Sequence, residues 1–425
     1  MNKSLHYEPY KVITLIFLIA IGLGSILLYL PITHNAGQTI SYIDALFTAT
    51  SALCVTGLNS IDFAAIFNPF GLTVIAILIQ LGGLGLICAG MIIAILIGQK
   101  IGLKERILLK ASLNLSSLKG VVKFTLNVIK ITFIIELVGA ILLALNFMKD
   151  YSFVKSLGLG IFHSISAFNN AGFDLLAKYN LFGPFAKIIT ILLIILGGLG
   201  YLVITDILSK KKFEKLTLHS KIVINTSITL LVIGTLLFMI TDEISVLDSI
   251  FMSTSARTAG FSVIDLSTIS NAGLLVIMIL MIIGASPGST GGGIKTTTFY
   301  ALFKGTISIY TNRNCESHKR TITRTIINKS FVILFSVLVI IFFNSFLICL
   351  FDKNLLLEDI LFEVTSAFCT VGFTTGITHK LSVVSKVIIC ITMFIGRVGT
   401  LTLLSIWLKE KKDNVKYPDE DIIIG

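Results

Sequence analysis

Residues 359–373 read DILFEVTSAFCTVGF, and this segment decides the fold because the chain carries four versions of it. In every version a Phe is followed four and five residues later by Ser-Ala, and the motif ends at a Gly that precedes Leu or Phe. The third version is one residue shorter between the Phe and the Gly. The copies span residues 44–58, 159–173, 248–261 and 359–373. This recurrence predicts a single supersecondary unit copied four times.

Long apolar segments flank each copy. An α-helix needs about 20 apolar residues to cross the hydrocarbon core of a membrane. Eight segments meet this length: residues 12–30, 71–97, 121–147, 184–204, 222–240, 272–300, 331–351 and 381–408. Only 13% of the 425 residues are charged, whereas soluble domains average about 25%. The chain is therefore predicted to be a polytopic membrane protein, and its 55% hydrophobic content excludes a disordered chain.

The charge of the chain follows the predicted spans. The 34 Lys and Arg against 23 Asp and Glu give a net charge of +11. Three segments between spans are basic and together hold 16 of the 34 Lys and Arg: residues 100–119, 210–221 and 304–329. By the positive-inside rule, these segments and both termini are predicted to lie in the cytoplasm. The basic excess thus reflects membrane topology and does not indicate a nucleic-acid partner.

The four motif copies are too short to cross a membrane. Each has an apolar stretch of about a dozen residues, which is typical of a re-entrant helix. Non-helical backbone at membrane depth needs protein or water around it, so the glycine-bearing loops are expected to line a central pore. Glycine can turn successive carbonyls toward an axis, and a ring of carbonyls can replace the hydration shell of K⁺. The fourth copy, Thr370-Val371-Gly372, matches the first three residues of the TVGYG pattern of K⁺ channels.

The predicted fold is an all-α polytopic membrane protein. It has four pseudo-symmetric repeats around a single pore, each made of a span, a short pore helix, a filter loop and a second span. The repeat boundaries are placed at residues 1–100, 101–210, 211–310 and 311–408, and a C-terminal tail covers 409–425. Because the six cysteines are scattered without a CxxC pair, we expect no disulfide framework and no side-chain metal cluster.

The four copies resemble the pore loops of the Trk/Ktr/HKT superfamily of potassium transporters. The resemblance runs from residue 12 to residue 408, and the chain's length is closer to the bacterial KtrB-type membrane subunit than to the longer Trk type. It implies a K⁺ selectivity filter in which each loop contributes backbone groups. The implied filter residues are Val55, Thr56 and Gly57; Asn170, Ala171 and Gly172; Thr258, Ala259 and Gly260; and Thr370, Val371 and Gly372.

The same resemblance implies a physiological setting. It suggests K⁺ uptake across a bacterial plasma membrane by a homodimer that rests on cytosolic RCK-type nucleotide-binding subunits. Stimulation by Na⁺ is also a property of the superfamily, and K⁺ is the expected permeant ion with no bound cofactor. In the plant branch, a serine at the first filter position favours Na⁺, so the glycine at Gly57 favours K⁺. The tail after residue 409 is either disordered or docked at the dimer interface.

The sixth predicted span contains a glycine-rich interruption at residues 284–296. A phosphate-binding loop is excluded because Ile294 separates the glycines from Lys295 and no strand is predicted before them. Two interpretations stay open, a flexible break in a packed helix and an unwound segment lining the cavity below the filter. The superfamily resemblance favours the second and implies an intramembrane gate. The gate residues are Gly288, Ser289, Thr290, Gly291, Gly292, Gly293, Lys295 and Arg397.

Placing an ionisable side chain inside a membrane span costs free energy, so such a residue suggests a function. Arg397 is expected to face the cavity beside the gate, where its charge would oppose cations, or else to snorkel or bind another helix. Lys295 ends the gate loop and either belongs to the gate or reaches the cytoplasmic interface. Glu363 and Arg257 either pair behind the filter or are satisfied separately. Glu136 is expected at a membrane interface or a lipid headgroup.

Three motif aspartates, Asp44, Asp248 and Asp359, stand three residues before their Phe. They are expected to cap the short helices, and an acidic outer mouth that concentrates cations is the other interpretation.

Two other classes of protein fit this sequence less well than a channel-like transporter does. An alternating-access carrier for a small solute typically has inverted repeats and paired broken helices, whereas the four motif copies share one orientation and a single span was predicted to be broken. An intramembrane enzyme needs a nucleophile with a base, or metal ligands, and His163 stands alone in its segment. A K⁺-selective, channel-like transporter therefore remains the leading hypothesis.

Overall fold

The structure is a computed structural model that describes residues 9–97, 99, 101–113, 117–176, 183–399 and 420. The helices and strands are α1 (Pro9–Tyr29), α2 (Tyr42–Cys54), α3 (Phe63–Ile66), α4 (Pro69–Leu84), α5 (Leu86–Leu96), α6 (Leu103–Ser112), α7 (Val121–Phe147), α8 (Phe153–Phe168), α9 (Pro184–Leu199), α10 (Tyr201–Lys210), α11 (Leu218–Thr241), α12 (Val246–Ser255), α13 (Asn271–Ile282), α14 (Thr296–Tyr310), β1 (Glu316–Ser317), β2 (Arg320–Thr321), α15 (Arg324–Phe351), α16 (Leu357–Cys369) and α17 (Val383–Val398).

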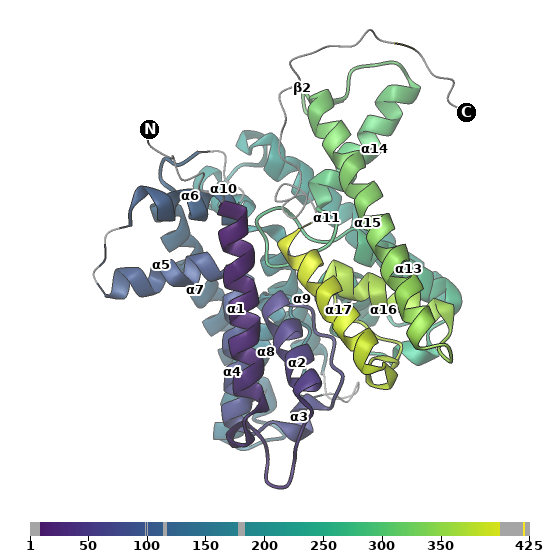
Figure 1. Ribbon diagram of the computed structural model, residues 1–425. Coiled ribbons are helices and arrows are strands. Elements are labelled where there is room, and N and C mark those ends of the chain that lie inside the picture. Colours follow the sequence, from purple (N-terminus) through teal and green to yellow (C-terminus); the bar gives the residue numbers. More distant parts are fainter. Residues whose placement is uncertain are drawn as a thin grey trace, which may run out of the picture.

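The helices recur in one order through the chain. A long helix (α1, α7, α11 or α15) is followed by a short one (α2, α8, α12 or α16) and then by a second long segment that starts with α4, α9, α13 or α17. Each short helix packs against the long helix before it, as α1 with α2 and α15 with α16 show (Figure 1). The all-α fold with short helices between spans is confirmed.

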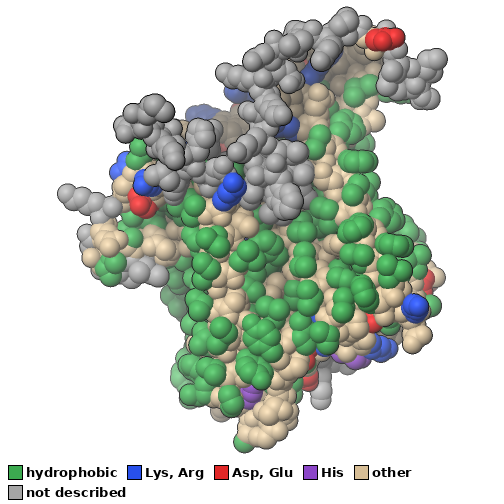
Figure 2. Space-filling view, viewed as in Figure 1, with side chains coloured by type: hydrophobic (Ala, Val, Ile, Leu, Met, Phe, Trp, Pro, Cys, Tyr) green, Lys and Arg blue, Asp and Glu red, His purple; other side chains and the backbone are tan. Residues whose placement is uncertain are grey.

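The long helices expose apolar side chains outward. Within the described residues, α1, α7, α11 and α15 are long and apolar enough to cross a membrane, and the bent pairs α4–α5 and α9–α10 raise the number to six. Their outer surfaces carry large hydrophobic side chains such as Leu23, Leu137 and Phe342. Figure 2 shows a broad hydrophobic band over the helices, with Lys and Arg toward its ends. This distribution is that of a multi-pass membrane protein.

The sixth predicted span is interrupted where the glycine-rich stretch predicts a break: α13 ends at Ile282, the chain is non-helical from 283 to 295, and α14 begins at Thr296. The eighth is described only as far as residue 399, so its end at 400–408 lies outside the described residues, as does the tail at 409–425 apart from residue 420.

One correction concerns the second and fourth spans. Only the sixth span was expected to be interrupted, but the second and fourth are also bent, by 102° at Gly85 and by 94° at Gly200. Both glycines have positive φ values, 85° and 87°, which other residues rarely adopt. Each bend lies at the last glycine of an LGGLG sequence, which spans residues 81–85 in the first case and 196–200 in the second. The expectation of a single broken span was therefore wrong, and it no longer counts against a carrier.

The motif Phe anchors each short helix in the core. Its side chain is buried in all four copies, at Phe47, Phe162, Phe251 and Phe362. Full burial of a Phe stabilises a fold by about 1.5–3 kcal/mol relative to leaving it exposed. The recurrent apolar position therefore anchors all four short helices in the core.

The motif aspartates do not cap their helices. The caps are Ser41 and Ser245, whose hydroxyls accept hydrogen bonds from the backbone N–H of Asp44 and Asp248 three residues later. The aspartates instead form ion pairs across repeats, Asp44 with Lys386 of α17 at 2.7 Å and Asp248 with Lys187 of α9. The N-cap prediction was thus wrong for both. Because each of these carboxylates has a lysine, neither supplies a free negative charge to the outer mouth.

The Asp44 pair gives the stability of the fold a pH dependence. Burial raises the pKa of Asp44, but hydrogen bonds from Lys386, Ser41 and Ser60 outweigh it and hold the pKa below its ordinary value. A carboxyl with a lowered folded-state pKa adds stability above its unfolded pKa, roughly 3.9, and this stability is lost as the pH falls through the folded pKa. We expect Asp44→Asn to lower the unfolding midpoint in detergent at pH 7 and to differ progressively less from the parent chain below about pH 4.

The matched control for this prediction is Lys380→Gln, which removes an exposed lysine close to the same mouth. It should leave the midpoint unchanged at every pH, because surface charges contribute little. A difference between Asp44→Asn and the parent chain that stays constant from pH 7 to pH 3 would contradict the role of the ionised carboxylate.

Candidate ion-binding site

The four motif glycines meet in a closed ring. A Cβ atom on any of them would lie 2.0–2.6 Å from a carbonyl oxygen of the next copy. The glycine and carbonyl pairs are Gly57 with Ala171, Gly172 with Ala259, Gly260 with Val371, and Gly372 with Thr56. The contacts run from the first copy to the fourth and back to the first, so four segments distant in sequence enclose one centre. Because real Cβ atoms do not approach oxygen so closely, only glycine fits at these positions.

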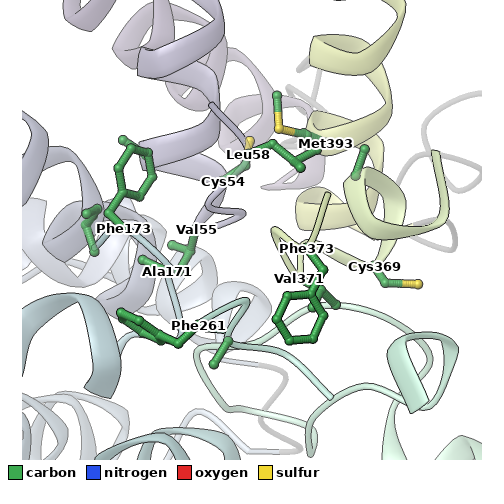
Figure 3. Packing of buried hydrophobic residues seen from close by; sticks show 14 of the residues in the cluster. Cys54, Val55, Leu58, Ala171, Phe173, Phe261, Cys369, Val371, Phe373 and Met393 are labelled. Atoms are coloured by element: carbon green, nitrogen blue, oxygen red, sulfur yellow. The ribbon is translucent and has the colours of Figure 1, made fainter. Parts of the chain in front are cut away.

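The backbone turns sharply where each short helix meets its loop. Val55, Asn170 and Thr370 have φ values of 59°, 59° and 50°, an uncommon left-handed conformation for residues with a side chain. Each stands two residues before its glycine, which also has positive φ. Such conformations persist only when the surrounding structure holds them, and they cluster at functional sites. Figure 3 shows Val55, Ala171 and Val371 around a common centre, with Phe173, Phe261 and Phe373 beside them.

The motif serine braces the loop in three copies. The hydroxyls of Ser51 and Ser366 accept hydrogen bonds from the backbone N–H of Gly57 and Gly372, both at 3.0 Å. In the third copy, which is one residue shorter, Ser255 donates to the carbonyl of Phe261 at 2.6 Å. Sequence reasoning found this serine as part of the motif but gave it no role. Its spacing, six residues before the glycine in three copies and five in the third, was the available signal.

The glycine-rich loop 283–295 lies directly against the ring. A Cβ atom on Gly291 would lie 2.6 Å from Cγ2 of Thr258, and one on Gly292 would lie 2.1 Å from Oγ1 of Thr370. The Thr290 hydroxyl accepts from Asn170 Nδ2 at 2.7 Å and donates to a carbonyl of α8 at 3.3 Å. The loop therefore contacts three of the four filter loops.

The other side of the loop is fixed to the broken fourth span. The backbone N–H of Ser286 donates to the carbonyl of Gly198 at 3.1 Å, and that of Tyr201 donates to the carbonyl of Gly288 at 3.0 Å. Ile283 and Ile294 form a parallel bridge that closes the loop at its base. No strand precedes the loop within residues 183–282, so the exclusion of a phosphate-binding loop stands.

Two cations hold the loop in place. Arg397 donates from its guanidinium to the carbonyls of Thr290 and of Gly82 in α4, so it joins the loop to the first repeat. Lys295 donates from Nζ to the carbonyl of Gly291 at 2.5 Å and so stays within the loop. Arg397, Lys295 and Gly82 line a cavity of about 330 Å³. Arg397 therefore lies beside the loop and lines the cavity, as one expectation had it, and it also joins two segments, whereas Lys295 bonds within the loop.

The sequence model of the TrkH family, described as "Cation transport protein", matches residues 8–241 and 216–416. The chain belongs to the TrkH family. "Potassium/sodium uptake protein NtpJ" of Enterococcus hirae is 37% identical over 98% of this chain and 97% of its own length. "Ktr system potassium uptake protein B" of Bacillus subtilis is 35% identical over 100% of this chain and 98% of its own length.

A solved structure agrees with the fold. "Crystal Structure of the Potassium Transporter TrkH from Vibrio parahaemolyticus" matches with a TM-score of 0.76 at 15% sequence identity, over 96% of this chain and 86% of that one. The resemblance to the Trk/Ktr/HKT superfamily is therefore confirmed. The chain is a membrane-embedded cation transport protein, and the relatives are named as transporters, not as enzymes.

The buried charges of this TrkH-family chain do not pair as one alternative suggested. Glu363 accepts a hydrogen bond from the Thr378 hydroxyl, and Arg257 donates to the Ser227 hydroxyl at 3.3 Å. No ion pair joins Glu363 to Arg257, both of which are described, so the two charges have separate partners, and Arg257 Nε and Glu363 Oε2 have no hydrogen-bond partner among the described residues. His163 hydrogen-bonds Thr190 at 3.0 Å in the core.

Glu136 was placed wrongly from the sequence. It was expected at a membrane interface or a lipid headgroup, but it is only 5% exposed and lies behind the second filter loop. Its carboxylate accepts hydrogen bonds from Gln80 and Asn169, which lie 56 and 33 residues away in the sequence. Such distances leave no local pattern from which the cluster could have been found.

Proposed function

We propose that the chain forms the K⁺-selective pore of a bacterial K⁺ uptake system and that the ring at Gly57, Gly172, Gly260 and Gly372 is its selectivity filter. The observation that carries this proposal is the cyclic contact between the four copies, because it brings backbone carbonyls of all four around one centre. Carbonyl rings of this kind replace the hydration shell of K⁺. The other filter residues are those predicted from the motif.

Further oxygen atoms and helix ends favour a cation at the ring. The hydroxyls of Thr56 and Thr370 are buried and have no hydrogen-bond partner among the described residues. The C-terminal ends of α2, α8, α12 and α16 lead into the four filter loops. A helix C-terminus carries a partial negative charge, so four of them stabilise a cation between them. One relative is named for potassium uptake and the other for potassium/sodium uptake, which supports K⁺ as a transported ion.

We also propose that loop 283–295 is an intramembrane gate. In this proposal Arg397 and Thr290 hold the loop below the ring, and cytosolic RCK-type subunits release it. Homodimerisation, stimulation by Na⁺ and cytoplasmic termini in a bacterial plasma membrane belong to the same proposal. The relatives named for a "Ktr system" support a multi-component assembly.

Growth of a K⁺-uptake-deficient bacterium tests the proposed function. Expression of the chain should restore growth on low-K⁺ medium, more strongly together with an RCK partner than alone. Gly158→Ser is a matched control, because Gly158 is exposed on a short helix and has no neighbour within 4 Å of a Cβ, so this variant should grow like the parent chain. Absence of growth with the chain present in the membrane fraction would contradict K⁺ uptake, and the alternating-access carrier for another solute would then be preferred.

A further inference from the structure

A buried polar cluster lies behind the second filter loop. The carboxylate of Glu136 in α7 accepts from Gln80 Nε2 of α4 at 3.0 Å and from Asn169 Nδ2 at 2.9 Å. Asn169 Nδ2 also donates to Gln80 Oε1 at 3.0 Å, so the three side chains form a closed triangle. Asn169 is fully buried. The cluster joins two long helices of different repeats to the residue where α8 ends.

The backbone around this cluster is held as firmly as the side chains. The Ser164 hydroxyl of α8 donates to the Glu136 carbonyl at 2.7 Å. On the opposite side, a Cβ atom on Gly83 would lie 1.9 Å from Asn169 Oδ1, so only a glycine in α4 leaves room for this amide. Asn169 is therefore fixed by hydrogen bonds on one side and by close packing on the other.

Asn169 directly precedes a strained part of the filter loop. Asn170 has a φ of 59°. Its side chain accepts from the Thr258 hydroxyl at 3.2 Å and donates to the Thr290 hydroxyl at 2.7 Å, which links the second loop to the third loop and to loop 283–295. An uncommon backbone conformation needs surrounding contacts that maintain it. The triangle supplies such contacts one residue before the strained position.

The first and fourth copies lack this device. The residue equivalent to Asn169, seven positions after the motif Phe, is Cys54 in the first copy and Cys369 in the fourth, and both thiols are buried. A buried Cys packs as a small hydrophobic residue and makes only weak hydrogen bonds. At this position the second copy therefore has a polar network where the first and fourth copies have a buried thiol, although the sequence motif treats the copies as equivalent.

We propose that Glu136 is a positioning residue for the selectivity filter. It acts through Asn169 to hold the second loop at the distance from its neighbours that suits K⁺. This inference rests on the proposed function of the ring. The hydrogen-bond acceptors of Glu136 are what matter. Without them Gln80 Nε2 loses the acceptor it has in the triangle, and Asn169 keeps only Gln80 Oε1 and the Ile165 carbonyl, so the triangle that holds Asn169 opens. Glu136 contacts no filter glycine in this arrangement and reaches the ring only through its neighbours.

Cation flux into proteoliposomes made from the purified chain tests the inference. Glu136→Leu removes both acceptors, and we expect the ratio of K⁺ to Na⁺ flux to fall at least about tenfold because the loop relaxes. Glu136→Gln keeps a carbonyl acceptor for Asn169 and should stay within about threefold of the parent ratio. The control is Asn344→Leu, which breaks a buried 2.8 Å hydrogen bond to Thr392 between α15 and α17. It should lower the unfolding midpoint and leave the ratio unchanged.

The outcomes separate the claims. A parent chain that does not favour K⁺ over Na⁺ refutes the proposed function itself. A selective parent chain with an unchanged ratio in Glu136→Leu overturns the positioning role and leaves the filter in place. Equal losses in Glu136→Leu and Glu136→Gln also overturn it, because the charge and not the acceptor would then matter. If Glu136→Leu does not fold, Asn169→Ala replaces it, and an unchanged ratio in that variant refutes the inference.

Discussion

Gly372→Ser is expected to remove most of the discrimination between K⁺ and Na⁺. The new Cβ would lie 2.1 Å from the carbonyl oxygen of Thr56 and 2.9 Å from the Cα of Gly57, so the fourth loop must move away from the first. Gly372 also has a φ of 98°, which serine rarely adopts. Both effects displace the carbonyls that the ring presents. We expect the K⁺ to Na⁺ flux ratio to fall at least tenfold, equivalent to about 1.4 kcal/mol of differential binding.

The measurement is flux of each ion into proteoliposomes. Gly260→Ser should have a similar effect, because its Cβ would lie 2.0 Å from the Val371 carbonyl on the same side of the ring. Gly158→Ser introduces the same side chain on a short helix without a neighbour within 4 Å, so it should retain the parent ratio. Unchanged ratios in both ring variants, with normal protein yield, would refute the filter assignment.

Deletion of residues 289–292 is expected to give constitutive flux. The deletion removes Thr290, whose hydroxyl and carbonyl bind Asn170, α8 and Arg397, and it removes the glycines packed on Thr258 and Thr370. The segment below the ring thereby loses its contacts with three filter loops and with Arg397. Coupling between distant sites is commonly worth 5- to 150-fold, and we expect K⁺ flux without a cytosolic partner to rise by roughly that factor.

A point variant distinguishes loss of the gate from general damage. Arg397→Gln shortens the side chain that bridges the carbonyls of Thr290 and Gly82, so partial opening is expected. Thr306→Ala, in α14 beyond the loop, removes only a hydrogen bond to the carbonyl of Leu302 at 2.9 Å and should flux like the parent chain. A deletion variant that stays closed, or that still requires the partner, would count against the gate.

The repetition of the motif made the central architecture predictable. Because Phe, Ser-Ala and Gly recur at fixed spacing, four short helices and four loops could be located without knowledge of their contacts. The recurrence of the glycine in every copy indicated a shared structural role, and the close contacts between the copies explain why only glycine fits there. The glycine-rich stretch after Ile282 was likewise recognisable, because such a sequence does not sustain a helix.

The remaining features depend on contacts between distant segments. Glu136 seemed to be an isolated charge because its partners lie in other helices, and Arg397 could not be assigned to the carbonyls of Thr290 and Gly82. The bends at Gly85 and Gly200 were missed because the spans were located from hydrophobicity alone. Both glycines are the last residue of an LGGLG sequence, which was the available signal. The helix caps were shifted by three residues because Asp44 and Ser41 are both good candidates for an N-cap.

Anomalous X-ray scattering from crystals grown with Tl⁺ in place of K⁺ tests most directly whether the glycine ring binds an ion. We expect an anomalous peak on the axis enclosed by Gly57, Gly172, Gly260 and Gly372, lost when crystals are soaked in Na⁺ and absent in Gly372→Ser. Tl⁺ bound only elsewhere in the chain, or a peak at the ring that Na⁺ leaves in place, would contradict a K⁺-selective filter at these glycines.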